Sequence, residues 1–268
     1  SLNMNTGVLS MTFSETMDAS SLIIGSFSLH SNASGAHATV LGASVLPSVD
    51  GTVLSVTLST AVLDTLKANP SIAVSTATSF LSIAAGAVKD MNANGVTPIS
   101  TAQALGAATF TSDATAPKVA GFDLNMNLGT LTVSFDEPIQ ATTFVETAVV
   151  LVRNSSGDGV QVRLSAAISV VASGNAAVVV TLATADVETL KLDTGIATAS
   201  TNTYLAIDAA AVRDTSANPS DAVASSNAVA VSSFTADSTA PQLASFSLNM
   251  NTNVLTLVFN VECRGCWC

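Results

Sequence analysis

The chain has 268 residues, of which 48% are apolar and 10% are charged, and its net charge is −11 with only eight Lys and Arg. This charge balance argues against a nucleic-acid partner, because phosphate neutralisation requires a basic face. No uninterrupted apolar stretch of about 18 residues occurs, so we expect no membrane-spanning helix.

A twelve-residue segment occurs three times. It reads LNMNTGVLSMTF at 2–13, LNMNLGTLTVSF at 124–135 and LNMNTNVLTLVF at 248–259. Thr-Ala-Pro and a short apolar segment precede the second and third copies, whereas only Ser1 precedes the first. The spacing predicts three parts: a first repeat at 1–113 that lacks its first strand, a complete second repeat at 114–237, and the opening hairpin of a third repeat with a Cys-rich tail at 238–268.

Each copy of this segment contains a turn followed by an alternating strand. Asn and Gly in the Asn-Met-Asn stretch tolerate turn conformations, and Leu9, Met11 and Phe13 then alternate with polar residues, as in a half-buried strand. Further strands are expected at 26–31, 37–46, 52–58 and 79–84, and in the second repeat at 147–153, 159–171, 176–182 and 203–208.

One short helical turn interrupts this pattern in each repeat, at 60–67 and at 184–191. We expect Thr60 and Thr184 to cap these turns, and each turn carries an acid early and a Lys late, as the helix dipole favours. About seven strands and one helical turn per repeat of roughly 120 residues predict an all-β fold of tandem immunoglobulin-like β-sandwich domains, each with one short helical turn.

Two motifs resemble a known family. FSETMD at 13–18 and FDEP at 135–138 resemble the FSEPMD signature of bacterial-type Ig-like (Big) domains. KDMNAN at 89–94 and RDTSAN at 213–218 resemble the late D-x-x-G-N turn of that family, with Ala93 and Ala217 in place of its glycine. The resemblance implies a spacer, an adhesin stalk or a fibre subunit of a large secreted or surface protein, although the fold alone does not decide among these.

No catalytic group of side chains is evident, so we expect no enzyme activity. The two histidines, His30 and His37, have Val152 and Gly159 as counterparts in the second repeat. An acid–base pair built on them would be confined to the first repeat. We expect both histidines to be surface or turn residues.

Several carboxylates recur between the repeats. They are Glu15 and Glu137, Asp90 and Asp214, and Asp113 and Asp237. Such residues could bind Ca²⁺ between domains, and Asp90, Asn92 and Asn94 have the spacing of the start of an EF-hand loop, but the twelfth position is Thr101 instead of Glu. Turns in which these side chains accept backbone hydrogen bonds are the other explanation. We therefore expect no metal or cofactor, and Asp90, Asn92 and Asn94 are only weak calcium candidates.

Asn32 and Asn154 begin N-glycosylation sequons at equivalent places in the two repeats. Two sequons in register predict covalent glycans if the source is a eukaryotic secretory pathway. The alternative is a polar Asn-Ser turn.

All three cysteines, Cys263, Cys266 and Cys268, lie in the last six residues. They lack the fourth ligand of a closed zinc site, and their odd number suggests a disulfide between chains. The alternative is a terminus that is not native.

The first repeat lacks a strand that the C-terminal part of the chain carries in addition, and this difference suggests self-assembly. The segment 239–248, TAPQLASFSL, corresponds to what the first repeat lacks, so Leu243, Phe246 and Leu248 are candidates for a strand that is donated to the next subunit. Such a head-to-tail contact does not close and would build a filament. The alternative is an ordinary tandem protein with residues upstream of Ser1.

These observations predict a structural subunit of an extracellular fibre or surface appendage, a homopolymer assembled by strand donation. The alternative is an adhesin stalk or a glycan-binding surface module. Apart from Phe, the only aromatic residues are Tyr204 and Trp267, so no aromatic platform for sugars is evident.

Overall fold

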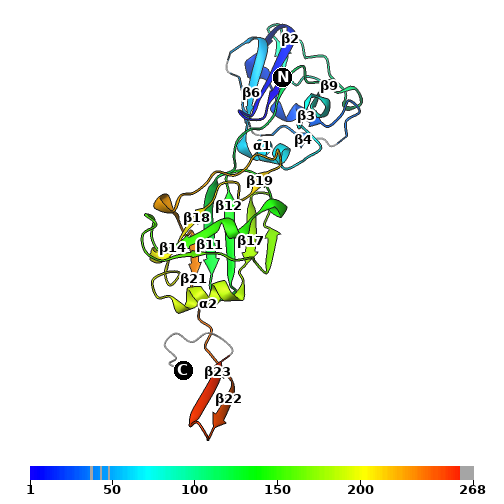
Figure 1. Cartoon of the computed structure of the whole chain (residues 1–268). Coiled ribbons are helices and arrows are strands. Elements are labelled where there is room, and N and C mark those ends of the chain that lie inside the picture. The colour runs from blue at the N-terminus through cyan, green and yellow to red at the C-terminus, as the bar shows by residue number, and fades with distance from the viewer. Residues whose placement is uncertain (37–38, 43, 48, 260–268) are drawn as a thin grey trace. The chain divides into compact units, whose positions relative to one another are not determined.

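The computed structural model describes the chain except for residues 37–38, 43, 48 and 260–268. The chain forms two compact units (Figure 1). The first comprises Ser1–Thr115 together with Asp214–Asn218, and the second comprises Ala116–Arg213 and the chain from Pro219 onward. The short segment Asp214–Asn218 thus belongs to the second repeat by sequence but to the first unit by packing.

Two sheets form the first unit. One has the order β10-β1-β2-β6-β5, with β8 also paired to β2, and the other has the order β4-β3-β7-β9. The strands are β1 (Leu2–Asn3), β2 (Val8–Asp18), β3 (Phe27–His30), β4 (Thr39–Val40), β5 (Ser44–Val45), β6 (Gly51–Leu58), β7 (Phe80–Ile83), β8 (Lys89–Asp90), β9 (Leu105–Gly106) and β10 (Phe110–Thr111).

The second unit repeats this arrangement. Its sheets have the orders β21-β11-β12-β17-β16 and β15-β14-β18-β20, strand for strand the orders of the first unit, and β13 pairs with β19. The strands are β11 (Val119–Asn125), β12 (Thr130–Phe135), β13 (Ile139–Gln140), β14 (Val149–Val152), β15 (Gln161–Arg163), β16 (Ser169–Ala172), β17 (Ala177–Thr181), β18 (Tyr204–Ile207), β19 (Arg213–Asp214), β20 (Val229–Ala230) and β21 (Ser233–Thr235).

Each unit has an apolar core between its two sheets, and the second unit has a smaller separate cluster of Val150, Val152, Ala206 and Ala228. In the first unit, Leu9 and Leu54 from one sheet cluster with Phe27 from the other. In the second unit, Val133 and Val178 cluster with Leu151 in the same way. Alternation along the strands supplies these inward residues, since every second side chain points to the same face. The described residues are therefore mostly β-structure, in two β-rich domains built from paired sheets.

Two α-helices occur among the described residues, α1 (Thr60–Lys67) and α2 (Thr184–Leu192), at the segments where the sequence predicts helical turns. Leu66 and Leu190 are buried and anchor the helices to the cores. The predicted threonine caps are wrong. Ser59 is the N-cap of α1 and accepts a hydrogen bond from the Val62 amide, whereas Ala183 precedes α2 without a side-chain cap. Both threonines occupy the first helical position instead.

Short 3-10 helices connect many of the strands. They span Ala19–Ser21, Ile24–Ser26, Thr76–Thr78, Thr101–Gln103, Ala141–Thr143, Glu146–Ala148, Ser200–Asn202 and Ser225–Asn227. None of the helices in the described part of the chain is long and apolar enough to cross a membrane.

The predicted long strands at 37–46 and 159–171 are wrong. Each is two short strands in different sheets: β4 pairs with β3 while β5 pairs with β6, and β15 pairs with β14 while β16 pairs with β17. The chain crosses from one sheet to the other within each of these segments. The sequence does not reveal the crossing, because an apolar residue gives the same signal whichever of the two sheets buries it.

His30 is not a surface or turn residue as predicted. It is the last residue of β3 and is 1% exposed, and its Nε2 lies 2.7 Å from Oγ of Ser82. Val152, its counterpart, is likewise buried. The position is a core position in both repeats, and a hydrogen bond to Ser82 satisfies the imidazole there. His37 lies outside the described residues.

The C-terminal hairpin consists of β22 (Leu243–Asn249) and β23 (Val254–Phe259), which pair only with each other among the described strands (Figure 1). Its register repeats that of β11 and β12: Phe246 lies opposite Leu257 as Phe122 lies opposite Val133. The three cysteines of the tail and their predicted disulfide lie outside the described residues.

Candidate functional site

An apolar groove of about 290 Å³ lies between the two sheets of the first unit. We call it the open groove. Residues from β2, β3, β7 and the β9 region line it, among them Leu9, Met11, Thr12, Phe13, Leu29, Phe80, Leu81, Ile99, Leu105, Gly106, Ala107 and Ala108. Leu105 is 60% exposed, so the groove presents apolar surface to solvent.

The second unit shows what fills the equivalent place. There β11 runs over Val119–Asn125 beside β12, whereas β1 covers only Leu2–Asn3 beside β2. Phe122 pairs with Val133, and its carbonyl accepts a hydrogen bond from the Ser232 amide. Phe122 is 1% exposed.

The counterparts of these partners line the open groove. Met11 corresponds to Val133, and Ala108 corresponds to Ser232. The open groove is therefore the space that the first half of β11 occupies in the second unit.

The first unit has an apolar groove without an occupant among the described residues, whereas the C-terminal hairpin has apolar side chains that nothing covers in the described structure. Leu243, Phe246 and Leu248, the predicted inter-subunit residues, are 51%, 70% and 56% exposed. Phe122 and Leu124, the counterparts of the last two, are each 1% exposed. An isolated two-stranded hairpin is at best marginally stable in water, so this segment gains stability from any surface that covers it.

The weak calcium candidates form a turn that is closed by its own hydrogen bonds. Oδ1 of Asp90 accepts from the amides of Asn92 and Asn94, both at 2.8 Å, and Oδ2 accepts from Nδ2 of Asn94 at 2.7 Å. These bonds, chiefly the one from the Asn94 side chain, lower the pKa of Asp90. Ala93 takes φ of 66°, a conformation that glycine adopts without strain.

Replacing Asp90 with Ala is expected to destabilise the first unit at pH 7. A lowered pKa in the folded state means that the carboxylate contributes stability above its unfolded pKa and loses that contribution as the pH falls through the folded value. The difference in urea midpoint between Asp90→Ala and the unaltered protein should therefore shrink as the pH is lowered from 7 towards 3. A midpoint that rises with added Ca²⁺, and only when Asp90 is present, would favour the calcium hypothesis instead.

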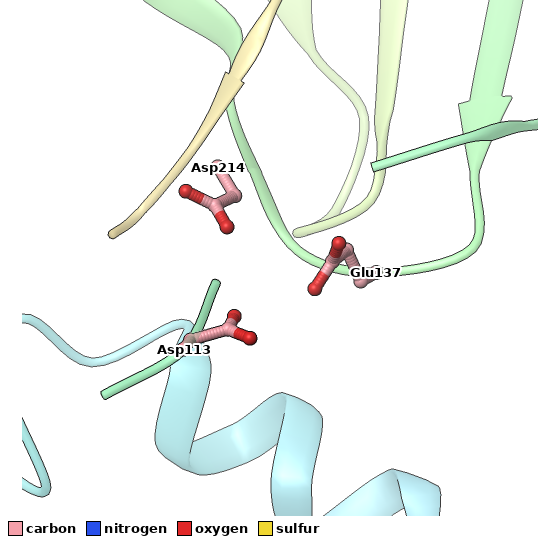
Figure 2. A group of neighbouring side chains, drawn as sticks. All are labelled: Asp113, Glu137 and Asp214. Carbon is pink, nitrogen blue, oxygen red and sulfur yellow. The ribbon is translucent and has the colours of Figure 1, made fainter. Parts of the chain in front are cut away.

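Asp113 and Asp214 lie together in the first unit. Figure 2 shows their side chains, along with that of Glu137, which belongs to the second unit. Carboxylate oxygens of Asp113 and Asp214 lie within 4.8 Å of one another, and Nζ of Lys67 lies 2.8 Å from Oδ2 of Asp113. A cation from the chain itself thus neutralises part of this charge. Glu137 is buried, whereas its counterpart Glu15 is exposed. The calcium hypothesis for the recurring carboxylates stays a prediction.

The ion pair of Lys67 with Asp113 has an equivalent in the second unit, where Nζ of Lys191 lies 3.1 Å from Oδ2 of Asp237. The sequence shows the late Lys of each helix and the recurring Asp, but no local pattern pairs them. Their common spacing of 124 residues was the available signal. Each pair ties the C-terminal end of the helix to the end of its repeat.

The sequon asparagines lie in equivalent loops after β3 and β14. Oδ1 of Asn32 accepts from the Ser34 amide at 3.0 Å, and Oδ1 of Asn154 accepts from the Asp158 amide at 3.0 Å. Asn32 thus forms an Asx turn, whereas Asn154 closes a wider turn through the amide four residues later. Glycosylation at these residues stays a prediction.

No protein-family model matches the chain, and no curated protein matches it. Among solved structures, the S-layer protein rSbsC(31-844) matches with 18% sequence identity over 56% of this chain and a TM-score of 0.29. The match spans 19% of that S-layer protein chain, about one fifth. At this TM-score the similarity carries no argument about fold or function.

Proposed function

We propose that the chain is a structural, non-enzymatic subunit of an extracellular fibre or surface appendage, and that its domains are immunoglobulin-like. Subunits assemble head to tail when β22 of one copy enters the open groove of the next. The observation that carries this proposal is that the chain presents, on separate units, an apolar groove and an exposed strand of the sequence type that fills the equivalent groove in the second unit.

The register of donation follows from the second unit. There Phe122, Gly121 and Val119 of β11 lie opposite Val133, Ser134 and Phe135 of β12. The equivalent pairing places Phe246 opposite Met11, Ser245 opposite Thr12 and Leu243 opposite Phe13. Contrary to the prediction from the sequence, Leu248 is not part of this contact, because Leu2 already pairs with Leu9 at the equivalent place, so only the first half of β22 enters the groove. Main-chain hydrogen bonds would supply affinity and the Phe246 side chain would supply specificity, as in other strand additions.

Donation requires β22 to exchange one partner. In the hairpin, β22 pairs antiparallel with β23 along the same edge that β11 uses for β12. To enter the open groove, β22 must release β23 and pair with β2 of the next copy. The exchange replaces one antiparallel ladder with another and buries Phe246. Full burial of such a side chain contributes roughly 1.5–3 kcal/mol, which favours the exchange.

Negative-stain microscopy tests this proposal. The unaltered protein is expected to form filaments, and Phe246→Asp is expected to abolish them because a carboxylate cannot enter the apolar groove without a large desolvation cost. Met250→Asp is the matched control: Met250 lies in the turn of the hairpin, is 73% exposed and has no place in the pairing register, so filaments should persist.

Monodisperse particles from the unaltered protein would contradict the proposal and favour an adhesin stalk, a glycan-binding module or a spacer. A chain segment preceding Ser1 would fill the same groove. A longer form of the protein that stays monomeric and does not respond to Phe246→Asp would identify that segment as the occupant.

A further inference from the structure

A cavity of about 180 Å³ lies at the end of the second unit, beside the C-terminal end of α2. We call it the second-unit cavity. Its lining residues are Met126, Lys191, Ala197, Thr198, Ala236 and Asp237.

The first unit has a cavity at the equivalent place, but it is smaller, about 60 Å³. The counterparts of all six residues line it: Met4, Lys67, Ala73, Val74, Ser112 and Asp113. Thr215 and Ser216 also line it. These two residues belong to the segment Asp214–Asn218, the late turn of the second repeat that packs as part of the first unit.

Two hydrogen bonds hold this turn in the first unit. Oγ1 of Thr215 donates to the carbonyl of Lys67, the last residue of α1, and Nδ2 of Asn218 donates to the carbonyl of Asp113 at 3.2 Å. Both acceptors have direct counterparts at the second-unit cavity, in Lys191 and Asp237. The second-unit cavity therefore has the features of a receptor for a turn of this type.

The chain carries a second turn of the same type on the first unit, at Asp90–Asn94. In both turns the amide of the final Asn donates to Oδ1 of the Asp, at 2.8 Å for Asn94 and at 2.7 Å for Asn218. Met91, the counterpart of Thr215, is 57% exposed, and the residues from Asn92 to Asn94 are exposed as well.

We propose that the second-unit cavity of one copy binds the Asp90–Asn94 turn of a second copy. This inference rests on the proposed head-to-tail assembly and adds a contact to the same joint, because the turn that binds belongs to the unit that receives β22. The contact uses different surfaces on the two copies, so it does not close on itself and continues along a filament.

The two surfaces are complementary at two points, a Met side chain and an Asn amide, although Met91 has no hydroxyl that could donate to the carbonyl of Lys191 as Thr215 does to that of Lys67. Met91 is the counterpart of Thr215, which with Ser216 already lines the first-unit cavity, so the volume of about 60 Å³ there is the space left beside that turn. The second-unit cavity, of about 180 Å³, is lined in part by apolar Met126 and Ala236. A flexible thioether side chain fills such a space well. Nδ2 of Asn94 uses one hydrogen for Asp90, which leaves the other to donate to the carbonyl of Asp237, as Asn218 does to Asp113.

Cross-linking of mixed proteins tests this contact. In a background with the three tail cysteines changed to Ser, a Met91→Cys protein is mixed with an Ala236→Cys protein under mild oxidation by oxidised glutathione. The expected result is a mixed disulfide dimer, because the counterparts Thr215 and Ser112 line one cavity in the first unit. Thr57→Cys, at an exposed position near the far end of β6, replaces Met91→Cys in the matched control and should yield no such dimer.

A second variant keeps the outcome decisive. Ala236→Trp fills the second-unit cavity and should reduce filament formation at least tenfold, whereas Ala222→Trp, at an exposed site of the same unit, should leave it unchanged. Two results together would overturn the contact: filaments of Ala236→Trp that form as readily as those of the control, and no mixed disulfide. This holds even if Phe246→Asp still abolishes filaments. If the mixed disulfide forms while Phe246→Asp has no effect, this contact stands and strand donation is wrong. A protein that neither cross-links nor assembles overturns both.

Discussion

Replacing Phe122 with Ala is expected to lower the free energy of unfolding of the second unit by about 3–5 kcal/mol, the usual cost of truncating a buried Phe. Phe122 is 1% exposed and belongs to the same core cluster as Leu131 and Val133. The same substitution at its counterpart, Phe246→Ala, should change the stability of dilute protein by less than about 0.5 kcal/mol, because that side chain is 70% exposed.

The two variants separate stability from assembly. Urea unfolding followed by far-ultraviolet circular dichroism, with hydrogen exchange to assign each transition to a unit, measures the first quantity, and sedimentation at high protein concentration measures the second. Phe122→Ala should lose stability, and Phe246→Ala should lose assembly. Equal destabilisation of the dilute protein by both variants would mean that Phe246 is already covered within its own chain, and the donated strand would then have no exposed apolar face to offer.

Replacing Lys67 with Met is expected to cost the first unit roughly 3–5 kcal/mol, the range for removing one partner of a buried ion pair. The side chains of Lys67 and Asp113 are 7% and 3% exposed, and Asp214 brings a second carboxylate within 4.8 Å of Asp113. Met preserves most of the side-chain volume, so the loss reports the missing charge and not a cavity.

Lys191→Met is the matched control in the second unit. Its partner Asp237 has a side chain that is 31% exposed, so solvent screens this pair and the expected loss is about 1 kcal/mol or less. Urea unfolding of both variants at pH 7 measures the difference. Equal losses of unfolding free energy in the two variants would show that the burial of the Lys67–Asp113 pair does not make it stronger than the more exposed Lys191–Asp237 pair.

The elements that the sequence predicts well are those with strong local signals. The alternation of Leu131, Val133 and Phe135 identifies β12, and the segment ending at Lys67 identifies α1, because side-chain period and helix-dipole preference are properties of neighbouring residues. Repeats add a second kind of information, since the copy at 248–259 predicts the C-terminal hairpin, and the structure shows that its register matches that of β11 and β12.

The elements that the sequence does not predict depend on distant partners. Nothing in the local pattern around His30 distinguishes a buried imidazole from a surface one, because its partner Ser82 lies 52 residues away. The pairing of Lys67 with Asp113 is likewise a contact between a helix and the end of the repeat, 46 residues apart in the chain. Strand periodicity also does not predict that Asp214–Asn218 packs with the first unit. The missing counterpart of Pro117–Phe122 predicts an open edge and an apolar groove in the first repeat, whereas the lining residues Phe80 and Leu105 come from the second sheet and are not predicted.

The measurement that tests strand donation most directly is a cross-link in its expected register. One protein carries Thr12→Cys and the other carries Ser245→Cys, with the tail cysteines changed to Ser. Directly opposed residues of paired strands have Cβ atoms about 4.5–5.5 Å apart, which is close enough for mild oxidation to join them. Strand donation predicts a mixed disulfide between these two proteins and little or none when Asn249→Cys, which lies outside the donated register, replaces Ser245→Cys. Filaments that form without the Thr12–Ser245 cross-link would contradict donation of β22 to β2.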